Sequence, residues 1–200
     1  PILTINELDK LRSIDSLSDN KFKACTIDIT FELKKEASLE KLLENELDRI
    51  CKLAKKSTDN YNIIILSDRN VSKNRMAVPA LLACSATHQH LIKEGLRTHT
   101  GLVVDTGSAK EIHHFALLAG YGAEAICPWL AFKTIEGISD DLSTAQNNYI
   151  KAVGKGLFKV MSKMGISTYQ SYCGAQIFEA VGLNQNFIDQ YFYGTSPNIE

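Results

Sequence analysis

The chain has 200 residues, with 22 basic and 23 acidic side chains and a formal net charge of −1. At this length, one domain or slightly more can bury about 70 % of the surface that its unfolded chain exposes. Because the charges nearly cancel, no net field draws the chain to nucleic acid or to an anionic membrane, and we expect neither as a partner. The sequence shows no charged-then-apolar leader and no uninterrupted apolar run near the roughly 20 residues that span a bilayer. We therefore expect a cytoplasmic protein and, because it starts at Pro1 rather than Met, a piece of a longer chain.

The cysteines argue against a disulfide framework and against a metal cluster. They are odd in number, widely separated, and free of CxxC or zinc-type spacing: Cys25, Cys51, Cys84, Cys127 and Cys173. We predict free thiols, buried or half-buried, in a reducing compartment. Cys84 falls on an apolar helix without a nearby base, which favours a buried thiol over a nucleophile.

The first elements follow from capping and periodicity. Thr4 and Glu7 have the spacing of a capping box and predict a short helix over residues 6–13. Residues 22–33 alternate and are rich in β-branched and aromatic side chains, which predicts one strand. Ser38 is expected to cap a helix with an apolar face that runs to residue 56.

Three strand-and-helix units are predicted next. Residues 61–66, 101–105 and 123–129 are short apolar runs typical of strands covered on both faces of a parallel sheet. One helix is expected to begin at Pro79 and end near Gly95, and a second is expected to follow Ser108 as its cap. This alternation predicts an α/β fold, a layered repeat of βα units with a mainly parallel sheet.

The last third of the chain predicts a helical C-terminal segment. The polar stretch at 138–144 is the best internal boundary, and residues 130–138 leading into it receive no helix. A long helix is predicted over 142–164, although Gly154 and Gly156 each cost about 1 kcal/mol there relative to alanine. Two short helices, QIFEAVG at 176–182 and NFIDQYF at 186–192, are expected to finish the chain.

The long helix carries a regular charge pattern. Lysines recur every four residues at Lys151, Lys155, Lys159 and Lys163, and apolar residues form its other side at Ile150, Val153, Leu157, Val160, Met161 and Met164. A solvated face is the simpler interpretation of the lysines. The alternative is a contact surface for another domain or for an anion.

Two carboxylates stand at predicted carboxyl ends of strands, where α/β sheets and barrels place their sites. Asp68 and Asp105 follow residues 61–66 and 101–104, and Arg69 is expected to neutralise Asp68. The string Asp105-Thr-Gly-Ser spells the aspartic-protease tetrapeptide, but it occurs once and within an alternating α/β pattern. Turn formation and capping are the preferred interpretation of both carboxylates.

The histidines show no helical metal pair, which needs i, i+4 spacing. His88 and His90 are two residues apart, His113 and His114 are adjacent, and His99 stands alone. A metal site would require the two groups to converge in space. Packing or interface roles are the simpler interpretation.

Several long segments resemble the central domain of the large subunit of glutamate synthase. The resemblance covers ILSDR at 65–69, NYIKAVGKGLFKVMSKMGISTYQSYCGAQIFEAVGL at 148–183, the stretch 79–132, and the opening 1–12. Departures are small: Gln89 stands where the family commonly has His, and Asp105 where it commonly has Glu. The second departure further weakens the protease interpretation.

The resemblance implies a parent enzyme that hydrolyses glutamine, passes ammonia through a tunnel, and reductively aminates 2-oxoglutarate on FMN and an iron–sulfur cluster. In that family the glutaminase nucleophile is an N-terminal cysteine, and the cofactor sites lie largely in a later barrel. None matches a position here, since Pro1 is not a cysteine and the cysteines lack cluster spacing. No catalytic, cofactor-binding or metal residue is therefore expected in this chain, and no cofactor of its own.

The resemblance also implies the role and the partners of the chain. The family's central domain joins the glutaminase domain to the FMN barrel and helps to wall the ammonia tunnel. The parent would receive electrons through a small reductase subunit or ferredoxin, and the regions that choose NADPH, NADH or ferredoxin lie outside this chain. Within it, residues 156–179 are expected to form a docking element, packed by the methionine side of the helix and held by its lysines.

Two other functions remain open at this point. The first is an independent α/β hydrolytic or metal-dependent enzyme that uses Asp68 and Asp105 with His88 and His114. The second is a stand-alone module that binds a small molecule. The first requires those four side chains to converge at one end of the sheet.

Overall fold

The structure, a computed structural model, describes residues 2–33 and 38–198, so that Pro1, on which the sequence argument drew, lies outside it. Its longer helices are α1 (Ile5–Arg12), α3 (Leu39–Ser57), α4 (Ala80–Lys93), α5 (Ile112–Gly120), α6 (Trp129–Ile138), α7 (Leu142–Lys163) and α9 (Gln185–Tyr191). Short helical turns are α2 (Ile14–Leu17), η1 (Arg97–His99) and α8 (Tyr169–Tyr172). The strands are β1 (Ala24–Asp28), β2 (Thr30–Glu32), β3 (Ile63–Ser67), β4 (Arg75–Ala77), β5 (Gly101–Asp105), β6 (Ala125–Cys127), β7 (Glu179–Ala180) and β8 (Ser196–Pro197).

The central sheet is parallel, which confirms the predicted α/β class. Its order is β1-β3-β5-β6, and each strand pairs with the next in parallel. The register aligns the carboxyl ends, because Asp28 is opposite Ser67, Ser67 opposite Asp105, and Asp105 opposite Cys127. Since the strand order follows the chain order, the sheet has no point of reversal, where open α/β sheets form their ligand crevice.

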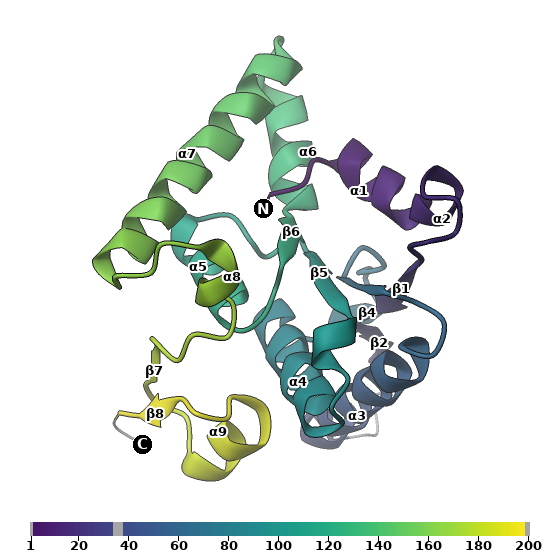
Figure 1. The fold of residues 1–200 in the computed structure, drawn as a ribbon, viewed down its shortest axis with the longest axis vertical. Helices are drawn as coiled ribbons and strands as arrows, with labels where there is room; N and C mark the ends of the chain where they lie inside the picture. The colour runs from purple at the N-terminus through teal and green to yellow at the C-terminus, as the bar shows by residue number, and fades with distance from the viewer. Residues whose placement is uncertain (1, 34–37, 199–200) are drawn as a thin grey trace.

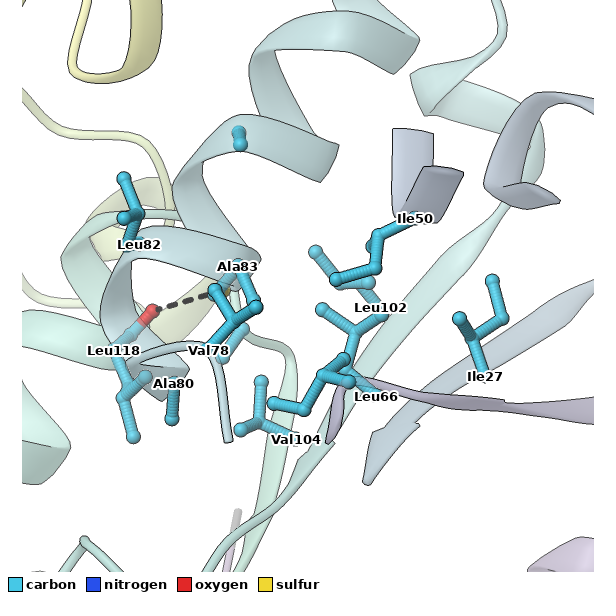
Figure 2. Close-up of a cluster of buried hydrophobic side chains, with 14 of the residues drawn as sticks. Ile27, Ile50, Leu66, Val78, Ala80, Leu82, Ala83, Leu102, Val104 and Leu118 are labelled. Carbon is cyan, nitrogen blue, oxygen red and sulfur yellow. Dashed lines mark hydrogen bonds between the residues drawn. The ribbon is translucent and has the colours of Figure 1, made fainter. Parts of the chain in front are cut away.

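Both faces of the sheet are covered, as the unalternating apolar strands predict. Leu66, Leu102 and Val104 lie in one core cluster with Ile50 of α3 and Ala83 of α4 (Figure 2). The alternate residues Ile65 and Val103 are buried on the other face with Leu8 of α1. Because successive side chains of a strand point to opposite faces of the sheet, each buried strand contributes residues to both core clusters.

The C-terminal third is mainly helical, as predicted. Figure 1 shows α6 and α7 meeting in a turn away from the sheet, so that α7 forms one long side of the molecule. Leu157 and Met161 of α7 pack with Ala116 and Ala119 of α5 and with Tyr172 in a second core cluster. The buried side of α7 thus belongs to this domain's own core.

The predicted strand over residues 22–33 is wrong as one element. It divides into β1 and β2, which belong to different sheets, and β2 pairs in antiparallel fashion with β4. Asp28 makes the break: its Oδ1 accepts the N–H of Thr30 at 2.8 Å, and its Oδ2 accepts Arg75 Nη2 at 3.3 Å and Asn70 Nδ2 at 2.9 Å. Burial alone would raise the pKa of Asp28, but the hydrogen bonds from Asn70 and Thr30 and the charge of Arg75 outweigh it and leave the pKa lowered.

Three other predictions differ from the structure. Residues 130–138, which received no helix, belong to α6, and β4 interrupts the predicted loop before Pro79. The helix predicted over 176–182 is absent from that described stretch, which instead contains β7. The contacts there are tertiary: Phe178 stacks on Tyr121, with ring centroids 5.9 Å apart, and Glu179 and Ala180 pair with Ser196 and Pro197 of β8.

The two glycines of α7 have different surroundings. A Cβ on Gly156 would lie 2.6 and 2.8 Å from Cγ1 and Cγ2 of Ile112 at the start of α5, closer than such atoms approach. A Cβ on Gly154 would meet nothing within 4 Å. Gly156 therefore permits a close helix contact, whereas no contact of the described domain explains Gly154.

Alanine substitutions at these two glycines should change stability in opposite directions. We expect Gly154→Ala to raise the free energy of unfolding by about 1 kcal/mol, because alanine favours the helix and fills open space. We expect Gly156→Ala to lower it by about 1–3 kcal/mol, because the added methyl group displaces Ile112. Urea unfolding of the two variants measures the difference, and equal shifts would contradict the proposed packing reason.

Candidate functional site

The polar residues at the carboxyl ends of the strands form one hydrogen-bonded cluster around two buried carboxylates. We call it the strand-end cluster and define it as Arg12, Ser67, Asp68, Arg69, Asp105, Thr106 and Trp129. Asp105 is fully buried, and its Oδ2 accepts three hydrogen bonds of 2.8 Å, from Arg12 Nη2, Arg69 Nε and Ser67 Oγ. The aligned register of β3 and β5 places Ser67 directly beside Asp105. One carboxylate therefore connects α1 to the ends of two strands.

Asp68, also buried, holds the next loop. Its carboxylate accepts Thr106 Oγ1 at 2.6 Å, the N–H of Gly107 at 3.0 Å and Trp129 Nε1 at 2.6 Å. The expectation that Arg69 neutralises Asp68 is wrong, because Arg69 pairs with Asp105 and lies 6.0 Å from the Trp129 ring centroid. The hydrogen bonds of Asp68 tie the turn after β5 to the first residue of α6.

The charges of the cluster balance, with two carboxylates and two guanidinium groups. Burial opposes the charge of Arg69, but its hydrogen bond and ion pair with Asp105 outweigh burial and raise its pKa. Burial, followed by the charge of Asp105, raises the pKa of the Cys127 thiol to about 12. Within the described residues, Asp105 Oδ1 is buried without a hydrogen-bond partner. These carboxylates are enclosed acceptors for the domain's own donors, rather than bases open to a substrate.

The turn after Asp105 is not the predicted helix cap. Ser108 bonds through its hydroxyl to Thr106 Oγ1 at 2.9 Å, and α5 begins four residues later with Glu111 at its N-cap. His114 caps instead: its Nδ1 accepts the N–H groups of Lys110 and Glu111 at 3.1 and 3.3 Å. An acceptor at Nδ1 fits a neutral imidazole.

The histidines do not join the carboxylates. His88 lies in the second half of α4 and contacts Arg97 and the turn before β6, at the amino ends of the strands. Asp68 and Asp105 stand at the other end, about 13 Å away along a five-residue strand. His114 lies at the start of α5, and its described hydrogen bonds go to backbone rather than to either carboxylate. The convergence that an independent enzyme would need is therefore not formed.

Residues 2–33 and 38–198 offer neither a metal-holding group nor a membrane-spanning helix. In that part of the chain no group of three or more His, Cys, Asp or Glu side chains could hold a metal ion. Among the same residues, no helix combines the length and the apolar character needed to cross a bilayer.

A second polar hub, which the sequence did not reveal, lies at the amino ends of the strands. Arg97 donates to His88 Nδ1 at 2.9 Å, to the carbonyls of Thr100 and Gly122 at 2.5 and 2.9 Å, and to Glu124 Oε1 at 2.9 Å. Gly122 has a φ of 105°, and a Cβ there would collide with the His88 ring. Burial, followed by the positive charge of Arg97, lowers the pKa of His88 to about 4.

The segment after α7 is fixed to this end of the domain. Tyr169 donates its hydroxyl to the carbonyl of Ala123 at 2.8 Å, and Tyr172 to that of Ala116 at 3.0 Å. The N–H of Gly174 bonds to the carbonyl of Gly120 at 3.0 Å. Residues 169–174 therefore close over the end of α5.

Two sides of α7 are used differently. Val153, Leu157 and Met161 are buried inside the domain, which corrects the expectation that they dock elsewhere, whereas Met164 is 50 % exposed. The four lysines at 151, 155, 159 and 163 are exposed, as predicted. Phe158, which the pattern of apolar spacing did not single out, is 68 % exposed.

The cysteines are free thiols, as predicted. The structure places Cys84 and Cys127 in the core and the other three at partly exposed positions. Burial raises the pKa of Cys84 to about 12, which confirms a buried thiol and opposes a nucleophilic role.

Fold and cluster together define a parallel α/β domain whose strand-end carboxylates bind the domain's own elements. Residues 1–184 match the family of glutamate synthase central domains. The chain belongs to this family, which confirms the resemblance and agrees with the mainly parallel architecture.

The names of three similar enzymes specify three different electron donors. The chain is 43 % identical to the NADPH glutamate synthase large chain of Bacillus subtilis, over 92 % of this chain and 13 % of the relative. It is 40 % identical to the NADH glutamate synthase of Schizosaccharomyces pombe, over 100 % of this chain and 10 % of the relative. It is 41 % identical to the chloroplastic ferredoxin-dependent enzyme of spinach, over 98 % of this chain and 13 % of the relative. The chain thus spans only 10–13 % of the length of these relatives.

Removing the charge of Asp105 should destabilise the whole domain. We expect Asp105→Asn to lower the free energy of unfolding by about 3–5 kcal/mol, because Arg12 and Arg69 lose their buried partner. Urea unfolding measures the loss. The matched control is Glu136→Gln, which breaks an exposed pair with Lys133 of 2.7 Å and should cost about 0–1 kcal/mol. A stable Asp105→Asn protein would refute the structural role of the cluster.

The domain should lose stability between pH 6.5 and pH 4 because of His88. The unfolded chain takes up a proton at the ordinary histidine pKa near 6.5, but the folded chain does so only near 4. Stability from this difference is present in full above pH 6.5 and falls by about 3 kcal/mol as the pH drops to 4. Urea unfolding against pH measures the slope. His88→Gln should remove the contribution of His88 to this pH dependence. An equal pH dependence in His88→Gln and in the unsubstituted chain would contradict the assignment to His88.

Proposed function

We propose that this chain is the central, connecting domain of a glutamate synthase large subunit. The whole enzyme converts glutamine, 2-oxoglutarate and a reductant into two molecules of glutamate. The chain links the glutaminase domain to the FMN barrel, contributes to the wall of the ammonia tunnel, and performs no chemistry alone. The observation that carries this proposal is the family match over residues 1–184, with relatives of which the chain is only about a tenth.

The geometry supports a connecting role. Sites in α/β folds usually lie at the carboxyl ends of the strands. Here the carboxylates at that end, Asp68 and Asp105, are buried and accept hydrogen bonds from α1, from the turn after β5 and from α6. The position that would hold catalytic groups in an enzyme instead joins distant parts of the chain.

The relatives support a role that does not depend on the electron donor. Enzymes named for NADH, NADPH and ferredoxin match the chain at 40 %, 43 % and 41 % identity. A segment that chose the donor would differ between these groups. We therefore assign contacts with ferredoxin or a small reductase subunit to other parts of the polypeptide.

The thiols of the described residues support a location of the iron–sulfur cluster elsewhere in the parent enzyme. Cluster ligation requires several neighbouring thiolates. Here burial raises the thiol pKa to about 12 at Cys84 and about 11 at Cys51, and no metal-holding group exists among the described residues. We place both cofactors of the parent enzyme outside these 200 residues, and we assign the chain neither catalytic nor cofactor-binding residues of its own.

We further propose that residues 1–200 act as one unit in the cytoplasm, without nucleic-acid or membrane partners. The near-zero net charge supports the last point. The suggested boundary at 138–144 falls on the turn between α6 and α7, and α7 packs back on α5 through Leu157. That packing favours a single unit over two.

The proposed division of labour is tested by comparing the chain with its parent polypeptide. We expect the parent to form glutamate from glutamine and 2-oxoglutarate, and the purified 200-residue chain to lack both flavin absorbance and glutaminase turnover. Visible spectra and an ammonia-release assay measure these properties. Stoichiometric flavin on the chain, glutaminase turnover by it, or a parent that makes no glutamate would refute the proposal.

A further inference from the structure

An apolar cavity of about 300 Å³ lies beside α7. Gly154, Leu157 and Phe158 of α7 form one side, and Ile2 and Ile126 form the other. Ile2 is held there because it bridges Ile126 in parallel and the N–H of Leu3 bonds to the carbonyl of Ile126 at 2.9 Å. Figure 1 shows the N-terminal segment between α7 and β6. We call this cavity, with the exposed Phe158 at its rim, the α7 groove.

The residues of the groove have no sufficient explanation within the domain. Phe158 exposes 68 % of its surface, although a phenylalanine side chain gains about 1.5–3 kcal/mol by full burial according to general transfer data. Gly154 weakens the helix at a position where a side chain would meet nothing within 4 Å. A glycine floor and an exposed aromatic rim are both explained if another apolar group enters the groove.

The charge beside the groove restricts what can enter. Lys155 and Lys151 precede Phe158 by three and seven residues, so they share its side of the helix. With Lys159 and Lys163 they form a positive border that is exposed along the helix. No salt bridge among the described residues uses these four lysines. The complementary surface is therefore apolar at its centre and acidic at its edge.

We infer that the α7 groove receives a segment of the same polypeptide from outside these 200 residues, with an apolar side chain in the groove and acidic side chains at the lysines. The chain spans only 10–13 % of its relatives, so most of such a polypeptide lies elsewhere. The inference rests on the proposed connecting role and names the surface that performs it. The docking side is the side of α7 that carries Phe158 and the lysines, not its buried methionine side.

Zero-length cross-linking of the full polypeptide identifies the occupant. A carbodiimide joins lysine amines to carboxylates in direct contact, and peptide mass spectrometry locates the products. We expect Lys151 or Lys155 to couple to Asp or Glu residues outside these 200 residues. Mixing copies labelled with ¹⁴N and ¹⁵N separates links within one polypeptide from links between two copies. Links only between copies, or none from these lysines, would overturn the inference.

Filling the groove gives an independent test in the full polypeptide. In Gly154→Leu we expect the occupant to be displaced and hydroxyl-radical modification of Phe158 to rise severalfold. The matched control is Gly137→Leu on α6, where a Cβ also meets nothing within 4 Å, and Phe158 should be unchanged. Gly154→Ala provides a milder variant should the leucine prevent folding. If Phe158 is as reactive in the unsubstituted protein as in Gly154→Leu, the groove is open in the full polypeptide and the inference is overturned.

Neither readout needs turnover, so the inference and the proposed function can fail separately. A polypeptide that forms the cross-links but makes no glutamate would refute the reaction and keep the docking surface. One that makes glutamate without the cross-links or the protection of Phe158 would keep the reaction and refute the surface.

Discussion

The buried carboxylate of Asp105 is the interaction on which the rest of the structure depends. Three donors converge on its Oδ2 at 2.8 Å, from α1, β3 and the loop after β3. A buried charge is tolerated only when it is paired, and Arg12 of α1 supplies one of the two guanidinium partners of Asp105, so α1 cannot leave the sheet without weakening the pairing of a buried carboxylate. The short α1, with Leu8 as its one buried residue, is thereby kept over the second face of the sheet. That face would otherwise expose Ile65 and Val103.

The same constraint determines what the side chains at the carboxyl ends of the strands contact. Carboxyl ends of parallel strands offer side chains that point to a common edge. Here Asp68 is occupied by Thr106, Gly107 and Trp129, and Asp105 by two arginines and Ser67. Among the described strands of the central sheet, the order also follows the chain, without the reversal at which open α/β sheets form a crevice. The polar side chains at this edge therefore hold parts of the domain's own chain together, which agrees with the proposed connecting role.

Local signals predicted those elements whose cause is local. The capping box of Thr4 and Glu7 forms, with the N–H of Glu7 on Thr4 Oγ1 at 3.2 Å, and the apolar runs became β3 and β5. Elements that depend on distant partners were missed: β4 exists because β2 pairs with it, and Glu179 and Ala180 pair with β8 instead of joining a helix. Arg12 reaches Asp105 across 93 positions of sequence, and no periodicity in a single chain marks such a pair.

The long helix α7 shows where periodicity stops being informative. Helical spacing located the buried residues Val153, Leu157 and Met161, although Met164 of the same predicted side is exposed. It assigned that side to docking, because a pattern of apolar residues does not tell which neighbour covers them. The structure shows that Leu157 and Met161 are covered by α5. It also explains Gly156, because the missing side chain there allows Ile112 of α5 to approach α7. What remains is Phe158, Gly154 and the lysines, which no part of the described domain covers. Once a core has used one side of a helix, residues that its own packing leaves unexplained are the evidence for a second contact.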